Sequence, residues 1–267
     1  MPTFKILPVL LLTLSAFTFA QEGAQSNLSR DPNVPPPEWN IQADPLKKGA
    51  PSVKDILGRA ARVYGAMETY QDHSIGKRTT LSQNTYTRTE SITKFDRNAD
   101  KFWFQSSLLY PSGERARPHL IWKQKDQIKT WSELNNRIEN FLSIDAALGD
   151  GSYSSNGASN LVPRAFFSET NLIDRVWTSS EHKYRISDVT ENGISYFRVQ
   201  EMVASSYGEP SETYWKITYW IRKKDALLVR VVKDAAGADL KFKFYVSTDY
   251  EPIINQPIAD SDFEFGH

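Results

Sequence analysis

Hydrophobic residues recur at helical spacing in one early segment of the chain. Ser52 is suited to cap the start of a helix, with Asp55 three positions later, and one apolar stripe follows. The stripe comprises Ile56, Ala60, Val63, Tyr64, Met67 and Tyr70. The pattern predicts an amphipathic helix that packs against a sheet.

Beyond this helix, the period of the pattern changes to two. Short turns separate successive segments, and the sequences at 98–101 and 123–127 are good turn formers. The alternating segments are 73–82, 86–95, 101–109, 117–125 and 127–133. Such a run predicts an antiparallel meander.

The period-two alternation is interrupted between about residues 140 and 180. Residues 140–151 predict a short helix that ends at glycine, 152–160 form a Ser/Gly/Asn loop, and 161–177 suggest further helical pieces. Alternation then returns in a hairpin around Glu191–Gly193, in a second hairpin at 213–234 and in a strand at 240–250.

The count is about ten strands. We therefore predict a mainly β (α+β) fold. A large curved antiparallel sheet forms an unclosed half-barrel, and the N-terminal helix and the mid-chain helical insertion pack on its concave side.

The N-terminus has a different composition. Lys5 precedes an apolar run, and Thr18 and Ala20 suit a cleavage site, so 1–20 is predicted to be a cleaved signal peptide. Residues 21–50 contain five prolines and are predicted to be a disordered tether, which leaves 51–267 as a single domain. The chain has no cysteine to carry a lipid, so the predicted location is the periplasm.

Charge and motifs limit the possible functions. Basic and acidic residues both number 32, which argues against a nucleic-acid binder. The four histidines lack metal-binding spacing, and there is no nucleophile elbow or phosphate-binding loop. We expect no enzymatic activity, no metal and no cofactor.

The order of the elements resembles the LolA/LolB-like lipoprotein-carrier superfamily. The matching stretches are VYGAMETYQD, RNADKFWFQSSLLYP, LIWKQKDQIKTWSELNNRIE, YWIRKKDALLVRVV and INQPIADSDFEF, which together span nearly all of 51–265. The chain looks like a divergent member. The resemblance implies helices that plug the concave side over a cavity for acyl chains. It also implies an arginine that ties down the helical lid, for which Arg78, Arg88 and Arg97 are the alternatives.

Candidate binding residues follow from the alternating pattern and the resemblance. The helix or lid is predicted to pack through Val63, Met67 and Tyr70. The basic turn of the hairpin at 213–234 consists of Arg222, Lys223 and Lys224, which are predicted to contact a lipid head group or a protein partner. The alternative is that this turn is charged only for solubility and to block edge pairing. The groove candidates are Phe102, Phe104, Leu120, Trp122, Trp215, Tyr219, Trp220 and Phe244. Their strand register decides which of them face the groove.

Two functions remain open. The first is a monomeric periplasmic carrier of lipids or acylated lipoproteins. The second is an envelope sensor or scaffold whose half-barrel binds a protein partner. An empty apolar cavity favours the carrier, whereas a filled concave face with an exposed apolar patch favours the scaffold.

Overall fold

The computed structural model describes residues 49–80, 85–110, 112, 114–152, 154–167, 183–204, 213–237 and 243–265. The predicted signal peptide and almost all of the predicted tether lie outside these residues, so both stay predictions. The same holds for the first residues of the strand predicted at 240–250.

The first described element is the predicted helix, α1 (Val53–Ala66). The Ser52 hydroxyl accepts a hydrogen bond from the Asp55 amide at 3.2 Å, and the Asp55 carboxylate accepts from the Ser52 amide at 2.9 Å. These reciprocal bonds satisfy backbone groups that the helix start would otherwise leave unpaired. The predicted capping pair is confirmed.

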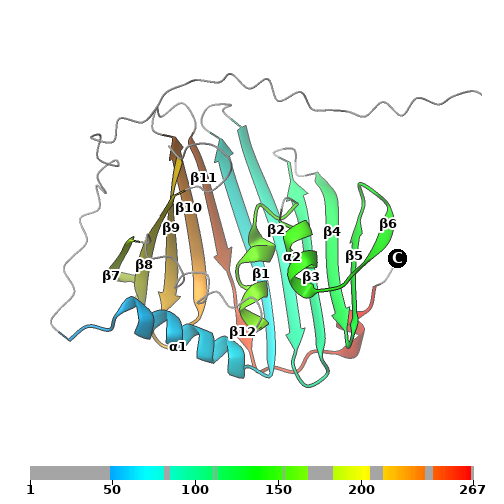
Figure 1. The fold of residues 1–267 in the computed structure, drawn as a ribbon, viewed down its shortest axis with the longest axis horizontal. Helices are drawn as coiled ribbons and strands as arrows, with labels where there is room; N and C mark the ends of the chain where they lie inside the picture. The colour runs from blue at the N-terminus through cyan, green and yellow to red at the C-terminus, as the bar shows by residue number, and fades with distance from the viewer. Residues whose placement is uncertain are drawn as a thin grey trace, which may run out of the picture. The chain divides into compact units, whose positions relative to one another are not determined.

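All strands in the described residues belong to one antiparallel sheet of twelve strands, which does not close into a barrel (Figure 1). Their spatial order is β6-β5-β4-β3-β2-β1-β11-β10-β9-β8-β7, with β12 paired to β1. The strands are β1 (Thr69–Thr80), β2 (Thr85–Asp96), β3 (Lys101–Leu109), β4 (Arg115–Gln124), β5 (Gln127–Ser132), β6 (Arg137–Phe141), β7 (Lys183–Glu191), β8 (Ile194–Ala204), β9 (Thr213–Arg222), β10 (Leu228–Gly237), β11 (Lys243–Tyr250) and β12 (Ile253–Ile254).

The chain order explains this topology. A meander starts in the middle of the sheet at β1 and runs outward to β6. The helical insertion then leads to β7 at the opposite edge, and a second meander returns until β11 pairs with β1. The predicted turns are confirmed: Asn192 and Gly193 both have positive φ between β7 and β8, and turns join β2 to β3 and β4 to β5.

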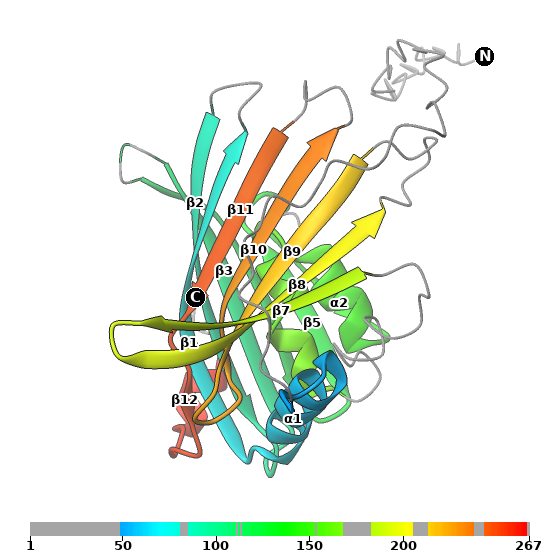
Figure 2. The same cartoon turned by 90° about the vertical axis from the view of Figure 1, so that its left-hand side faces the viewer.

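The helices cover one face of the sheet (Figures 1 and 2). The helical elements on this face are α1, α2 (Ile144–Asp150) and the 3-10 turns η2 (Ala158–Asn160) and η3 (Pro163–Phe166). The main hydrophobic core lies between them and the strands, with Tyr70, Phe102 and Leu148 almost fully buried in it. We call this side of the sheet the helix-bearing face.

A second, smaller core lies on the other face. It consists of Trp103, Leu120, Trp122 and Phe263, with Trp131, Ile258 and Phe265 packed against it. The C-terminal segment, which includes η5 (Asp260–Phe263), supplies three of these residues and so covers β3 to β5. Both faces of this half of the sheet are therefore buried.

Candidate functional site

Aromatic side chains from the insertion fill the middle of the helix-bearing face. The Phe166 ring stacks on Phe95 with centroids 4.8 Å apart and lies 4.7 Å from Tyr70. Phe167 approaches Phe95 and Phe102 edge-on, at 5.8 and 5.3 Å. These contacts hold η3 against β1, β2 and β3, so the insertion acts as a plug on the sheet.

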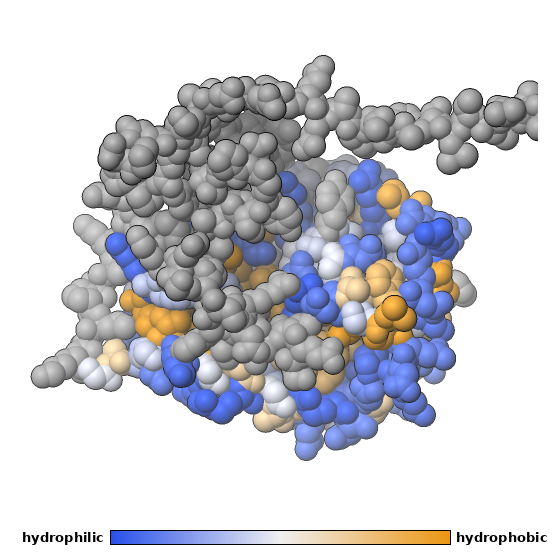
Figure 3. Space-filling view, in the orientation of Figure 1, coloured by the Kyte–Doolittle hydropathy of each residue, from blue (hydrophilic) through white to orange (hydrophobic). Residues whose placement is uncertain are grey.

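A pocket of about 510 Å³ lies beside this plug, between α1, α2, η3 and the sheet. Its apolar lining comprises Ala61, Phe95, Ile128, Leu142, Ile144, Ala165, Phe166 and Phe167. Gly65, Arg97, Asp100, Lys123 and Ser143 complete the lining. Figure 3 shows this side of the molecule, where small hydrophobic groups reach the surface among hydrophilic residues. We call this cavity the lid pocket.

Arg97 ties α1 to the sheet at the edge of the lid pocket. Its guanidinium donates to the Met67 carbonyl at 2.8 Å and to the Tyr64 carbonyl at 3.0 Å, and it lies 5.0 Å from the centre of the Phe95 ring. The last carbonyls of a helix lack partners within the helix, and a cation there also suits the helix dipole. Arg97 therefore anchors the end of α1, and which arginine has the lid-binding role implied by the resemblance stays a prediction.

Beyond the plug, small polar residues form a buried band on the helix-bearing face. It crosses β11, β1, β2, β3, β4 and β5 and comprises Thr248, Ser74, Thr89, Ser91, Thr93, Ser106, His119 and Thr130. The loop after α2 lies over this band, where the Asn156 amide donates to the Thr89 hydroxyl. The face thus changes from aromatic to polar along its strands.

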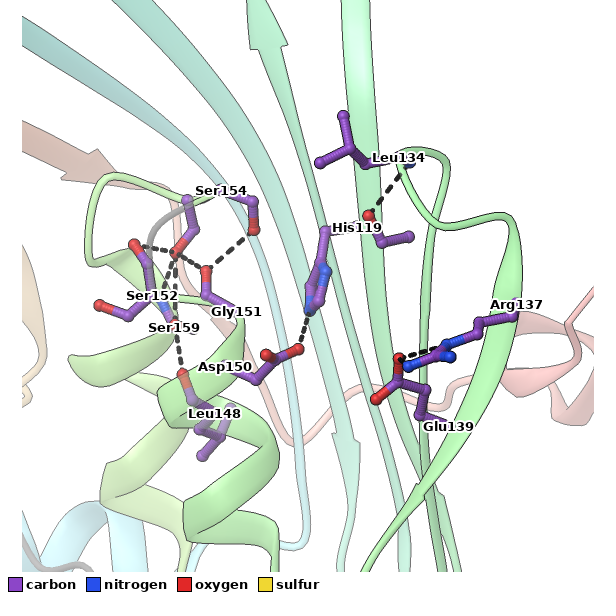
Figure 4. A network of polar contacts seen from close by, with 12 residues as sticks. His119, Leu134, Arg137, Glu139, Leu148, Asp150, Gly151, Ser152, Ser154 and Ser159 are labelled. Carbon is purple, nitrogen blue, oxygen red and sulfur yellow. Dashed lines mark hydrogen bonds and ion pairs between the residues drawn. The ribbon is translucent and has the colours of Figure 1, made fainter. Parts of the chain in front are cut away.

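The end of α2 meets the sheet at His119 (Figure 4). The His119 Nε2 atom lies 3.8 Å from the Asp150 carboxylate, and burial lowers the pKa of the imidazole while Asp150 opposes that shift. Ser155 and Ser159 donate to the carbonyls of Gly151 and Leu148, at 2.7 and 2.8 Å. These bonds lock the loop onto the end of its own helix.

Asp72 on β1 is a buried carboxyl group next to the plug. Its Oδ2 accepts a hydrogen bond from the Tyr70 hydroxyl at 2.7 Å. Burial raises the pKa of Asp72 to about 6, and the hydrogen bonds from Tyr70 and Thr93 limit the rise. This group titrates within a mildly acidic range.

The structure divides the eight groove candidates between the two faces. Phe102, Phe104 and Tyr219 belong to the core of the helix-bearing face. Trp215 and Phe244 both pair with Ala235 and occupy positions of the same parity as Tyr219. Whether these residues contact a ligand stays a prediction.

Leu120, Trp122 and Trp220 lie on the opposite face, so a groove on the helix-bearing face does not include them. Leu120 and Trp122 pack under the C-terminal segment. Trp220 packs against Tyr196, with the Arg230 guanidinium 5.3 Å from its ring centre. The reason is register: Phe104 pairs with Ile121, which places Leu120 and Trp122 on the other side of β4.

The helix-packing candidates all lie in or against the main core. Met67 and Tyr70 are buried, and Val63 packs against them from α1. Two of the three residues predicted to contact a head group or a partner form ion pairs within the protein. Arg222 is paired with Asp225 at 2.8 Å, and Lys223 is paired with Asp188 at 2.9 Å. The third, Lys224, is exposed.

A larger cavity, of about 840 Å³, lies on the other face. Its lining includes the charged residues Lys94, Glu191, Arg222, Arg230, Asp249 and Glu251. Several are paired, as Arg230 is with Glu191 at 3.5 Å. Charged residues make up a larger share of this lining than of the lining of the lid pocket, and both cavities have walls of mixed polarity.

The residues of the lid pocket were missed as a site from sequence alone. Ile144, Phe166 and Phe167 lie in the insertion, where no periodicity marks an inward face. The only hint of this site in the sequence is the pair of adjacent aromatic residues, Phe166 and Phe167, which stands directly before a polar stretch.

Within the described ranges, no three residues with metal-binding side chains cluster. The same part of the chain contains no helix with the length and hydrophobicity needed to cross a membrane.

No family model matches the chain, and no curated protein matches it. Solved structures resemble it, and three of them illustrate the level of similarity. LprF from Mycobacterium bovis is 12% identical over 79% of the present chain and 97% of its own length, with a TM-score of 0.40. A DUF1329 family protein from Desulfovibrio piger is 12% identical, with coverages of 80% and 98% and a TM-score of 0.37. An outer membrane lipoprotein-sorting protein domain from Vibrio parahaemolyticus is 8% identical, with coverages of 78% and 94% and a TM-score of 0.33.

At this level of similarity, the fold description rests on the chain's own sheet and helices. The predicted architecture, an unclosed antiparallel sheet with an N-terminal helix and a helical insertion on one face, is confirmed.

Proposed function

We propose that this chain is a periplasmic binding protein that carries the acyl chains of a lipid or of an acylated lipoprotein in the lid pocket. The observation that carries the proposal is a pocket with walls of Phe95, Ile128, Ile144 and Phe167 beneath the helices. Its volume of about 510 Å³ is in the usual range for small-molecule sites, roughly 300–1,000 Å³.

The energetics suit reversible binding. Each methylene group removed from water contributes about 0.8 kcal/mol, so a single long chain supplies a strong driving force. Movement of η3 away from Phe95 and Tyr70 would enlarge the pocket but expose aromatic surface. This cost opposes binding and keeps cargo release possible.

Charged groups in the pocket lining match a lipid with an anionic head. Arg97 and Lys123 both line the pocket, and Lys123 is ion-paired with Asp100. A phosphate or carboxylate at this position would compete with Asp100 for the lysine while the acyl chain enters between the helices and the sheet.

Gly65 provides a direct test of this site. It lines the pocket, and a Cβ atom added there meets no atom within 4 Å, so there is room for a side chain to start and we expect Gly65→Leu to narrow the pocket. Leucine also favours the helix over glycine, which protects the fold. Gly58→Leu is the matched control, because Gly58 is on the same helix but does not line the pocket.

We expect Gly65→Leu to weaken the uptake of a fluorescent fatty acid at least tenfold and Gly58→Leu to leave it unchanged. Equal uptake by both variants would show that the lid pocket is not the binding site.

The scaffold remains the second candidate, because Phe166 and its neighbours already fill the middle of the helix-bearing face. Absence of fatty-acid uptake by the unaltered protein would favour this function.

A further inference from the structure

The strand β6 lies at one end of the sheet (Figure 1). Its outer edge pairs with no strand in the described part of the chain. Such an edge presents backbone groups that can pair with another chain, and proteins commonly protect it with lysine, proline or a bulge. The β6 sequence Arg-Ile-Glu-Asn-Phe has no lysine or proline, and its register with β5 is unbroken.

Exposed aliphatic side chains gather next to this edge. Among the described residues, Leu134 is 71% exposed, Ile138 47% and Leu142 fully exposed. The other exposed aliphatic residues, Ile194 and Ile253, lie singly elsewhere. Exposed aliphatic residues along an edge strand without lysine, proline or a bulge make this edge a candidate for pairing with another chain.

We propose that β6 pairs antiparallel with β6 of a second copy of this chain, centred on Ile138. A two-fold axis through that residue makes the contact self-complementary, as in most homodimers. Ile138 then faces Ile138 of the second copy. Leu142 of each copy extends toward the turn that carries Leu134 in the other. All three exposed aliphatic residues take part.

The charges of β6 favour this register over the two registers centred on the neighbouring residues. Arg137 and Glu139 lie on the same face of the strand, with their side chains 2.7 Å apart. A pairing centred on Ile138 sets Arg137 of each copy opposite Glu139 of the other copy, so two pairs of opposite charge form across the contact. A shift that centred the axis on either neighbour would set like charges opposite each other, which destabilises a strand pair.

The resulting dimer joins two open sheets through one short strand. This contact is small beside the roughly 1,200–2,000 Å² of a stable interface, so the dimer is weak and depends on concentration. The sequence alone predicted a monomer, because nothing in its pattern marked β6 as a strand with a free edge.

Charge exchange tests the proposal in sedimentation velocity experiments on the full mature protein at rising concentration. The unaltered protein should shift from its own mass toward twice that mass. Arg137→Glu places a second carboxylate opposite Glu139 and should weaken association at least tenfold, whereas the double variant R137E/E139R should restore it. A monomer at every concentration, or a dimer that R137E leaves intact, would overturn the proposal.

Cross-linking tests the register. The chain has no cysteine, so a single introduced thiol reports on its own position. Ile138→Cys meets its symmetry mate across the axis and should form a disulfide dimer under mild oxidation. Asn140→Cys is the matched control: it is also exposed, but its mate lies four residues along, about 13 Å away. Cross-linking through position 140 and not 138 would contradict the proposed pairing.

Discussion

The guanidinium of Arg97 donates to the Met67 carbonyl at 2.8 Å and so fastens the last turn of α1 to the end of β2. A second bond to the Tyr64 carbonyl and a backbone bond from the Arg97 amide to the Glu68 carbonyl reinforce the junction. One residue thus connects the helix over the lid pocket with the floor of that pocket.

Arg97→Ala should lower the free energy of unfolding by about 1 to 2 kcal/mol, because two charge-assisted bonds to helix carbonyls are lost at a partly exposed site. Urea denaturation measures this change. Arg88→Ala removes an exposed arginine from β2, the strand that precedes Arg97, and should change stability by less than about 0.5 kcal/mol. An equal effect of both substitutions would refute the special role of Arg97.

The raised pKa of Asp72 predicts a dependence of stability on pH. The folded-state value of about 6 exceeds the model-peptide value of 3.8, so the folded protein holds the proton more tightly than the unfolded chain. The free energy of unfolding should therefore fall as pH rises from about 4 to about 6, by about 3 kcal/mol in total.

Asp72→Asn removes this titration while it keeps an oxygen for the Tyr70 hydroxyl. Denaturation of the variant at pH 4 and pH 7 should show a smaller loss of stability with rising pH than the unaltered protein shows. Asp126→Asn, in the exposed turn between β4 and β5, is the control and should leave the loss unchanged. If D72N retained the full loss, the dependence would have another origin.

The C-terminal segment should contribute to stability and not to ligand binding. Phe263 is 1% exposed under Trp103 and Trp122, and its backbone carbonyl accepts a bond from the Gln124 amide at 3.1 Å. Phe263→Ala should lower the free energy of unfolding by about 3 to 5 kcal/mol. Uptake of a fluorescent fatty acid by the folded variant should be unchanged, and a loss of uptake would place the binding site on this face.

Trp220 provides a further check on which face binds. Trp220→Glu should leave fatty-acid uptake within about twofold of the unaltered protein, since this residue lies on the face away from the helices. Abolished uptake by a folded W220E protein would mean that the other face holds the ligand. Circular dichroism confirms the fold of the variant.

Much of the fold could be predicted because local signals were strong. Ser52 and Asp55 marked the start of α1, the sequence at Glu191–Gly193 marked a hairpin, and period-two alternation marked most strands. The strand β6 was missed, and the count of about ten became twelve, because β6 is short and β12 has only two residues. Neither is long enough to show a period.

The candidate site was less predictable because it depends on contacts between distant segments. Trp122 and Phe104 both belong to alternating strands with apolar residues on both sides, so sequence could not show which face the helices cover. Phe265 stacks on Trp122 from a distant part of the chain, with centroids 4.8 Å apart. Only the register and this C-terminal contact reveal that Trp122 lies away from the helices.

The same dependence on distant contacts applies to the lid pocket. Its walls combine β2, β5, α2 and η3, and no one segment carries a signature of the site. Three arginines were alternatives for the lid-binding role in the sequence; the bonds of Arg97 join it to α1, and the choice among the three for the lid stays a prediction.

The most direct test of the central claim is native mass spectrometry of the protein purified from its own cells, followed by extraction of bound lipid. We expect about one acyl-bearing molecule per chain, lost or strongly reduced in the Gly65→Leu variant and retained in Gly58→Leu. A ligand-free mass for the unaltered protein, together with no uptake of added fatty acid, would contradict the claim that the lid pocket carries acyl chains.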